Sequence, residues 1–146
     1  ITYEVRVYDY GAKEWLLNGE RHREDGPAVE YSNGDKSWHL NGKYHREDGP
    51  AVESSDGTKE WWLNDELHRE DGPAIENYSG SKHWFLNGNR HREDGPAIEY
   101  SNGDKVWQLD NTEYTEEEFN KKMSPAVEMT VAEVEEALGR KVKIIK

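Results

Sequence analysis

The chain has 146 residues, of which 33% are hydrophobic and 34% are charged, and its 31 acidic and 19 basic residues give a net charge of −12. This charge repels nucleic-acid phosphates, so direct nucleic-acid binding is not expected. Cysteine is absent, which excludes disulfides and thiolate metal sites, and no run approaches the roughly 20 apolar residues of a transmembrane helix. We therefore expect a cytoplasmic protein without a signal peptide at its start.

An amino-terminal capping strand is predicted over residues 1–10. Ile1, Tyr3, Val5 and Val7 alternate there with polar residues, and a period of two is typical of a half-buried strand. Such a strand begins a sheet.

Residues 11–114 repeat with a period of 23 residues, giving four full copies and a partial fifth. The segment His-Arg-Glu-Asp-Gly-Pro-Ala begins at residues 22, 45, 68 and 91. A register kept over about two thirds of the chain indicates a repeat architecture.

Each copy is predicted to be a β-hairpin. In the second copy, Asn41-Gly42 separates two alternating runs, and both residues tolerate the positive φ of a tight turn. Asn33-Gly34 predicts the reversal before it, and Asp48-Gly49-Pro50 predicts a bend after it, since proline cannot donate to a ladder. The expected fold is mainly β: an elongated, twisted, single-layer antiparallel meander of stacked hairpins.

These residues resemble MORN-type repeats, which are also 23 residues long, and most closely the variants found in bacterial and phage proteins. Gly34, Trp38, Gly42 and His45 match the positions of the MORN pattern, whereas the glycine that usually follows the histidine is Arg46 here. The resemblance covers residues 11–114. It implies a twisted sheet of hairpins in a family associated with scaffolding and with protein or lipid contacts.

One face of the sheet is predicted to be constant. If Asn41-Gly42 and Asn33-Gly34 each close a two-residue loop, Trp38 lies between His45 and Val29, so tryptophan, histidine and valine share a face. We interpret this face as structural. Its repeat ladder consists of Trp15, Trp38, Trp61, Trp84, Trp107, His22, His45, His68 and His91.

The opposite face is predicted to vary from copy to copy. Aromatic residues beside arginine are typical of binding surfaces, and the alternative is that these residues support cross-strand packing or a homodimer. The predicted partner row consists of Leu16, Arg21, His39, Tyr44, Trp62, Leu67, Phe85 and Arg90. A glutamate column on the same face is either a solvated edge or an imitation of a phosphate backbone, and it consists of Glu30, Glu53, Glu76 and Glu99.

The His-Arg-Glu-Asp segments suggest catalysis or metal binding only at first sight. Equivalent histidines roughly 10 Å apart cannot share a metal ion, and an enzyme rarely needs its site in several consecutive copies. We expect no catalytic residue, no metal and no cofactor. The histidine is predicted to bond a neighbouring backbone group or stack on tryptophan, and the arginine to pair with a carboxylate of the adjacent copy. A nucleotide site built from arginine and tryptophan is the alternative.

Residues 115–146 are predicted to form a carboxyl-terminal cap of two short helices and a closing strand. Thr115 with Glu118 and Thr130 with Glu133 have capping-box spacing, and Val142 and Ile144 alternate with lysines.

The predicted function is that of a non-enzymatic interaction module that binds and occludes a partner protein. The resemblance to phage repeats suggests an inhibitor of a host defence factor, an acidic mimic similar to anti-CRISPR proteins, which acts in the host cytoplasm. A nucleotide-sequestering sponge is the second hypothesis. A scaffold or membrane-associated repeat protein is the third.

Overall fold

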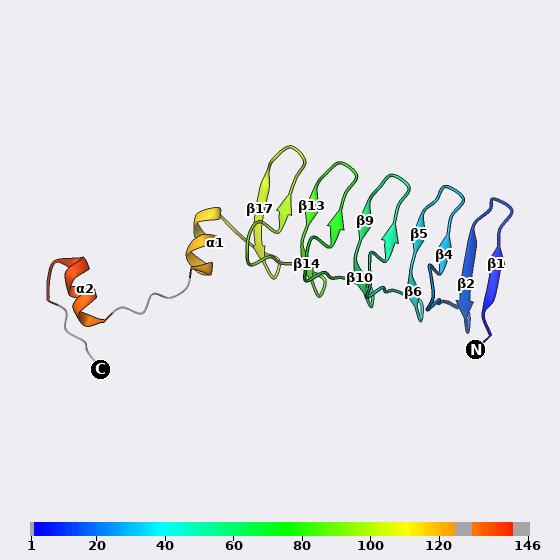
Figure 1. The fold of residues 1–146 in the computed structure, drawn as a ribbon, viewed down its shortest axis with the longest axis horizontal. Helices are drawn as coiled ribbons and strands as arrows, with labels where there is room; N and C mark the ends of the chain where they lie inside the picture. Colours follow the sequence, from blue (N-terminus) through cyan, green and yellow to red (C-terminus); the bar gives the residue numbers. More distant parts are fainter. Residues whose placement is uncertain (1, 125–129, 142–146) are drawn as a thin grey trace.

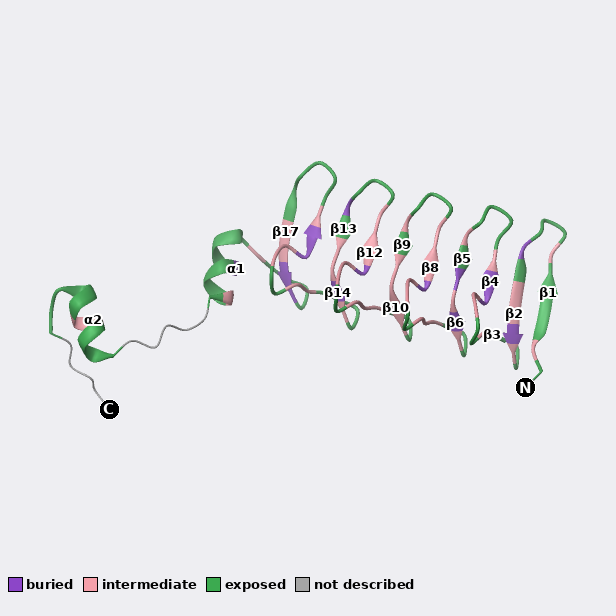
Figure 2. Ribbon diagram, viewed as in Figure 1, coloured by how far each residue is buried: buried purple, intermediate pink, exposed green. Residues whose placement is uncertain are grey.

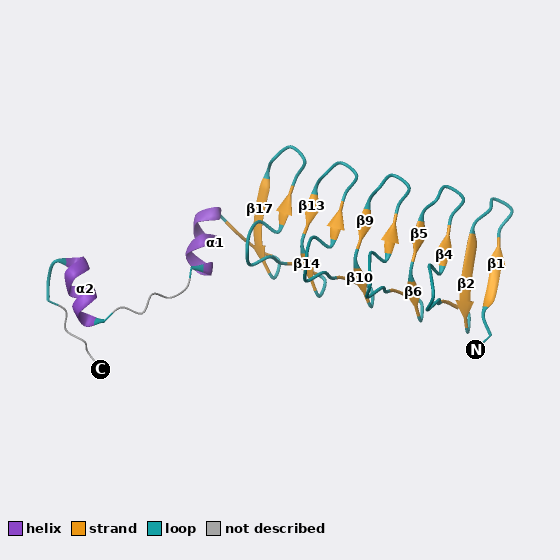
Figure 3. Ribbon diagram, in the orientation of Figure 1, coloured by secondary structure: helices purple, strands orange, loops and turns teal. Residues whose placement is uncertain are grey.

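The chain folds into an elongated row of hairpins followed by two helices, as seen in a computed structural model that describes residues 2–124 and 130–141 (Figure 1). The row starts with β1 (Glu4–Val7) and β2 (Lys13–Leu17), and β3 (Glu20–Arg21) follows β2. The expected mainly β, antiparallel architecture is confirmed. Among the described residues, the strands precede the helices (Figure 3).

Each later copy has an upper and a lower hairpin in the view of Figure 1. In the second copy these are β4 (Val29–Glu30) with β5 (Lys36–Ser37), and β6 (His39–Leu40) with β7 (Lys43–Tyr44). The following strands are β8 (Val52–Glu53), β9 (Lys59–Glu60), β10 (Trp62–Leu63), β11 (Glu66–Leu67), β12 (Ile75–Glu76), β13 (Lys82–His83), β14 (Phe85–Leu86), β15 (Asn89–Arg90), β16 (Ile98–Glu99), β17 (Lys105–Leu109) and β18 (Thr112–Tyr114).

The upper hairpins, together with β3 and β18 of the first and last lower hairpins, form one 12-stranded antiparallel sheet in the order β1-β2-β4-β5-β8-β9-β12-β13-β16-β17-β18, with β3 paired to β2. The lower hairpins are also joined to their neighbours. Arg23 N donates to the His39 carbonyl oxygen at 3.0 Å, and Gly42 N donates to the Arg21 carbonyl oxygen at 2.9 Å. Two strands per copy therefore advance along one continuous hydrogen-bonded array, as a meander requires.

The lower turn is the one expected, but the upper turn is longer than predicted. Asn41 and Gly42 have φ values of 51° and 79°, which suit a two-residue hairpin loop. In the upper turn, Tyr31 N donates to the Asp35 carbonyl oxygen at 2.9 Å, leaving a three-residue loop that ends at Gly34 with φ 98°. The predicted two-residue loop at Asn33-Gly34 is wrong, and the register moves by one residue.

This shift changes which residues share a face. Val29 lies opposite Ser37 and Glu30 lies opposite Lys36. Ser37 and His39 share a face, because Ser37 Oγ lies 2.9 Å from His39 Nε2. The prediction that valine shares the tryptophan face is therefore wrong, since Val29 lies with Ser37 and His39 on the other side. We call this side the reverse side.

Every full copy bends at its tryptophan. Trp38 N donates to the Ala51 carbonyl oxygen at 2.8 Å, while its own carbonyl oxygen accepts from His45 N at 3.1 Å, so the chain between His45 and Ala51 loops out of the sheet. The bend predicted at Asp48-Gly49-Pro50 is present. The alanine that ends each loop is fully buried, as Ala28, Ala51, Ala74 and Ala97. Figure 2 shows buried segments recurring along the hairpin row.

The helix α1 (Glu116–Met123) closes the carboxyl-terminal end of the sheet. Thr115 and Glu118 form the predicted capping box, and Phe119 is buried at 3% exposure, where α1 packs against β17 and β18. The helix α2 (Val131–Leu138) has its predicted capping box at Thr130 and ends at Gly139, but none of its residues is buried. The predicted closing strand around Val142 and Ile144 lies outside the described residues.

Within residues 2–124 and 130–141, no helix combines the length and apolarity that a membrane crossing requires.

Candidate binding site

Three equivalent cavities line the side of the sheet that carries the repeated tryptophans. We call this side the pocket side and the three cavities the pocket row. Their volumes are about 740, 730 and 670 Å³. Each lies between the looped-out segments of two successive copies. They are centred on Trp38, Trp61 and Trp84 in chain order.

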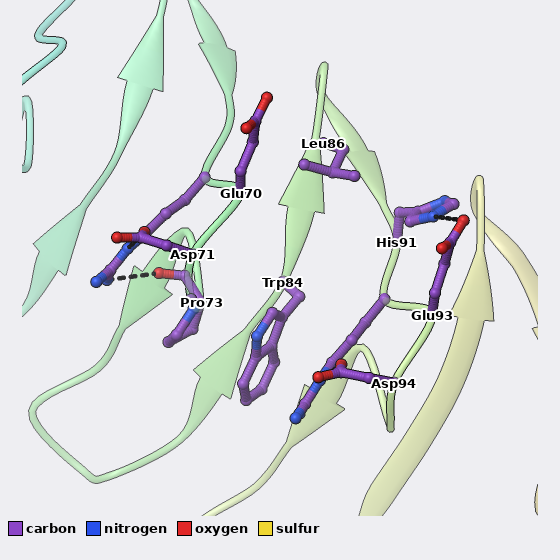
Figure 4. A pocket seen from close by; sticks show the side chains of 11 residues that line it. Glu70, Asp71, Pro73, Trp84, Leu86, His91, Glu93 and Asp94 are labelled. Carbon is purple, nitrogen blue, oxygen red and sulfur yellow. Dashed lines mark hydrogen bonds and ion pairs between the residues drawn. The ribbon is translucent and has the colours of Figure 1, made fainter.

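The cavity at Trp84 shows how the chain builds each pocket (Figure 4). The indole stands between the loop that carries Asp71 and Pro73 and the loop that carries Asp94. Leu86 and His91 also line this pocket. Because Trp84 and Leu86 are separated by two positions, both side chains lie on the pocket side, whereas Phe85 between them lies on the reverse side.

An arginine covers one face of each of the first four tryptophans of the repeat ladder. The guanidinium carbon lies 4.2, 4.1, 3.9 and 4.0 Å from the ring centroid in the pairs Arg23–Trp15, Arg46–Trp38, Arg69–Trp61 and Arg92–Trp84. A guanidinium stacked in this way is attracted by the negative charge of the ring face.

Each arginine also holds its own loop closed. Arg92 Nε donates to Asp94 at 2.7 Å, and Nη1 donates to the Pro96 carbonyl oxygen at 3.2 Å and to Glu99 at 2.9 Å. A side chain on Gly95 would place its Cβ 3.0 Å from the Arg92 guanidinium carbon. A larger residue in place of the glycine of Asp-Gly-Pro would therefore displace the guanidinium by a few tenths of an ångström.

These contacts correct two predictions about charges. The arginine pairs with carboxylates of its own segment, at two and seven residues further along the chain, and not with those of the adjacent copy. The glutamate column does not lie on the variable face. Glu53, Glu76 and Glu99 lie on the pocket side, half-buried and ion-paired to Arg46, Arg69 and Arg92 at 2.9 to 3.1 Å. The one-residue shift of the upper turn explains the second correction.

The aspartates of the loops are held in their ionised form. The hydrogen bond from Arg46 lowers the pKa of Asp48 below its ordinary value, and Arg69 and Arg92 do the same for the pKa values of Asp71 and Asp94. The arginines are thus largely occupied by the loops to which they belong.

An exposed acidic row borders the pockets and is not among the predicted site residues. The side chains of Glu47 and Glu70 are 85% and 86% exposed. Each pocket is lined by two guanidinium groups and four carboxylates, so its net charge is negative. The looping Asp-Gly-Pro segment was the only sequence signal that could have indicated that Glu24, Glu47, Glu70 and Glu93 face solvent.

The repeated histidines join neighbouring copies. Nδ1 of His22 accepts from the backbone N–H of Asn41 at 3.0 Å, and the equivalent bonds of His45, His68 and His91 are 3.1 to 3.3 Å long. Nδ1 of each histidine also lies 2.9 to 3.0 Å from the side-chain oxygen of the same residue in the next copy, which is Asn41, Asn64, Asn87 or Asp110. In the part of the chain that the structure describes, no group of three or more metal-ligating side chains could hold a metal ion.

The predicted partner row lies on the reverse side with its cross-strand pairs as expected. Leu16 lies opposite Arg21, His39 opposite Tyr44, Trp62 opposite Leu67, and Phe85 opposite Arg90. Much of this row is packed against itself. Leu16, His39 and Phe85 are buried, and Arg90 is exposed.

Three aromatic members of the partner row contact one another along the sheet with tilted rings. The ring centroids of His39 and Tyr44 are 4.3 Å apart, and those of Tyr44 and Trp62 are 5.6 Å apart. Burial, aided by the positive charge of Arg21, lowers the pKa of His39. The packing accounts for these residues without a ligand, and their predicted role in partner binding stays a prediction.

No protein-family model matches the chain, and no curated protein matches it significantly.

Proposed function

We propose that this chain is a non-enzymatic interaction module that holds a cationic segment of a partner protein in the pocket row. The observation that carries this proposal is the repetition, in successive copies, of a partly exposed tryptophan beside an excess of carboxylates. Lysine and arginine side chains are attracted both by indole faces and by carboxylates, and the aliphatic stem can lie along an apolar floor. Leu40, Leu63 and Leu86 supply such a floor.

The charges favour this reading over a nucleotide sponge. Arg69 and Arg92, the two cations of the pocket at Trp84, already donate to loop aspartates, proline carbonyls and glutamates. A phosphate entering that pocket would meet Glu70, Asp71, Glu93 and Asp94 and would have to displace one of them. Because like charges in close contact are unfavourable, anionic ligands are the weaker candidates.

The first test is neutralisation of the exposed row. The triple variant Glu47→Gln, Glu70→Gln, Glu93→Gln removes three charges from the pocket row and leaves the arginine-paired aspartates intact. We expect it to lose at least tenfold in affinity for basic peptides, measured by fluorescence anisotropy at low salt. The matched control Glu113→Gln, Glu116→Gln, Glu117→Gln removes the same charge elsewhere and should retain binding. Equal losses in both variants would leave only a non-specific attraction and would overturn the proposal.

The second test uses adjacent tryptophans on opposite sides of the sheet. Trp61 lines a pocket, whereas Trp62 lies on the reverse side, with its Nε1 donating to Glu60 at 2.8 Å. Trp61→Phe should weaken binding of a basic peptide several-fold and Trp62→Phe should leave it unchanged. The opposite result would return the binding site to the predicted partner row.

We also propose a repeat family and a class of partner for this protein. We assign the copies to the MORN-type repeats on the residues that match their pattern, and we propose that the cationic segment belongs to a basic protein, such as an enzyme that acts on nucleic acid. A phage-encoded inhibitor of a host defence enzyme in the cytoplasm agrees both with the MORN-type assignment and with the proposed partner. Pull-down from bacterial lysate with the wild type and with the triple glutamine variant tests it: a basic nucleic-acid enzyme captured only by the wild type supports it, and capture by neither contradicts it.

A further inference from the structure

We infer that the pocket row selects a polyproline II segment in which a lysine or arginine recurs at every third position. This inference rests on the proposed function and specifies the conformation and spacing of the bound segment. The three pockets have equivalent linings and follow one another along the sheet. One partner segment that lies along the sheet therefore passes all of them.

The spacing of the pockets is set by the sheet. Each copy contributes two strands to the sheet order, as in β4-β5, β8-β9 and β12-β13. Neighbouring strands lie about 4.8 Å apart, so equivalent pockets are separated by about 10 Å. A bound segment must therefore present cationic side chains on one side at intervals of about 10 Å.

A polyproline II helix meets this requirement. It has three residues per turn and rises about 3.1 Å per residue, so every third side chain points the same way at intervals of about 9 Å. A β-strand advances about 10 Å in three residues, but its third side chain points to the opposite face. The strand period of two gives about 7 Å and does not match the pockets.

An α-helix also matches in spacing but not in width. Side chains seven residues apart lie on one side at intervals of about 10.5 Å, but the helix is 10 to 12 Å across with its side chains. Successive pockets share a loop, so a segment that passes all of them crosses the loops that flank each tryptophan (Figure 4). The axis of the wider α-helix would lie further from the indoles than the backbone of a polyproline II segment.

The chemistry of the lining supports the same choice. Aromatic-lined grooves recognise polyproline II segments because these segments are already extended and lose little entropy on binding. Each pocket offers one indole and one leucine for contact with proline or with the stem of a lysine. The carboxylates of the two loops then surround the cationic head, and the pockets bind one segment multivalently.

The test compares three labelled peptides of equal charge against the full chain by fluorescence anisotropy. The first has four Lys-Pro-Pro units, the second has the same residues with the four lysines in succession, and the third is a helical peptide with lysines seven residues apart. We expect the first to bind at least tenfold more tightly than the second and third. Equal binding of the first and second, or tighter binding of the third, would overturn the inference.

Pocket variants separate failure of this inference from failure of the proposed function. If the peptides bind equally but all lose affinity in Trp61→Phe and in the triple glutamine variant, the pocket row binds cations and only the predicted spacing is wrong. If none of the peptides responds to either variant, both the spacing and the cation-binding function are wrong. Trp62→Phe serves as the folded control in each comparison.

Discussion

The two sides of the sheet are built on different rules. On the pocket side, tryptophan, arginine, aspartate and glutamate recur with nearly unchanged geometry, for example with arginine 3.9 to 4.2 Å from the tryptophan centroid in the first four copies. On the reverse side, the residue after the tryptophan changes at every copy, as Leu16, His39, Trp62, Phe85 and Gln108. Yet the reverse side holds the more deeply buried residues, including His39 at 2% exposure.

Residues that stay the same between copies are usually associated with a core, but here the more deeply buried residues are the ones that change. The pocket side repeats because each arginine must satisfy an indole, an aspartate, a carbonyl and, in the later copies, a glutamate within its own segment, and any change breaks several contacts. The reverse side varies because each residue needs only to pack against its neighbours, as His39 does against Tyr44. Residues that are identical in the copies here take part in a local set of polar contacts. Their identity does not indicate how deeply they are buried.

The largest effect on stability is expected from a substitution that disrupts the packing of the reverse side. Phe85→Ala should lower the free energy of unfolding by about 3 kcal/mol, because it leaves a cavity at a residue that is only 8% exposed. Phe85→Leu, which places there the residue found at position 16, should cost about 1 kcal/mol. Urea unfolding followed by tryptophan fluorescence measures both. Equal effects of alanine and leucine would contradict the packing described for this side.

A smaller effect on stability is expected when the arginine contacts of one copy on the pocket side are removed. Arg69→Ala removes the cation over Trp61 and the bonds to Asp71, Pro73 and Glu76. We expect a loss of about 2 kcal/mol in the same urea experiment, since hydrogen bonds between charged groups contribute about that much. Arg69→Lys should recover only part of it, because an ammonium cannot stack and donate as a fork. Full recovery by lysine would show that charge alone is needed.

The hydrogen bond within the reverse side should contribute less. Ser37→Ala leaves His39 Nε2 without its partner at 2.9 Å and should cost about 1 kcal/mol. Ser37→Thr keeps the hydroxyl and is the matched control. Unchanged stability of the alanine variant would mean that the bond has no net value.

The smallest effect is expected in the pH dependence of stability. The folded-state pKa of His39 is lowered, so the unfolded state binds the proton more readily, and stability falls as the pH drops below the ordinary value of 6.5. His39→Gln, which uses the residue found at position 108, should flatten this slope. Thermal unfolding from pH 7.5 to 5 measures it, and identical slopes for both proteins would assign the pH dependence to other groups.

Prediction from the sequence succeeded for features that depend only on residues within one copy. The tight turn at Asn41-Gly42, the bend at Asp48-Gly49-Pro50 and both capping boxes depend on neighbouring residues, and all are present. The upper turn was predicted one residue too short, because Asn-Gly is compatible with both loop lengths. Since side chains alternate along a strand, that single residue moved Val29 and Glu30 to the wrong sides.

The amino-acid sequence by itself determined the period, the strands, the antiparallel order and the sign of the charge, because turns and alternation act over a few residues. Only the tertiary structure decided which side carries the pockets, which carboxylates are tied to arginine and which face solvent, and that the changing residues are buried. These properties arise where copies meet, and contacts between residues about 20 positions apart depend on register, which local preferences do not determine.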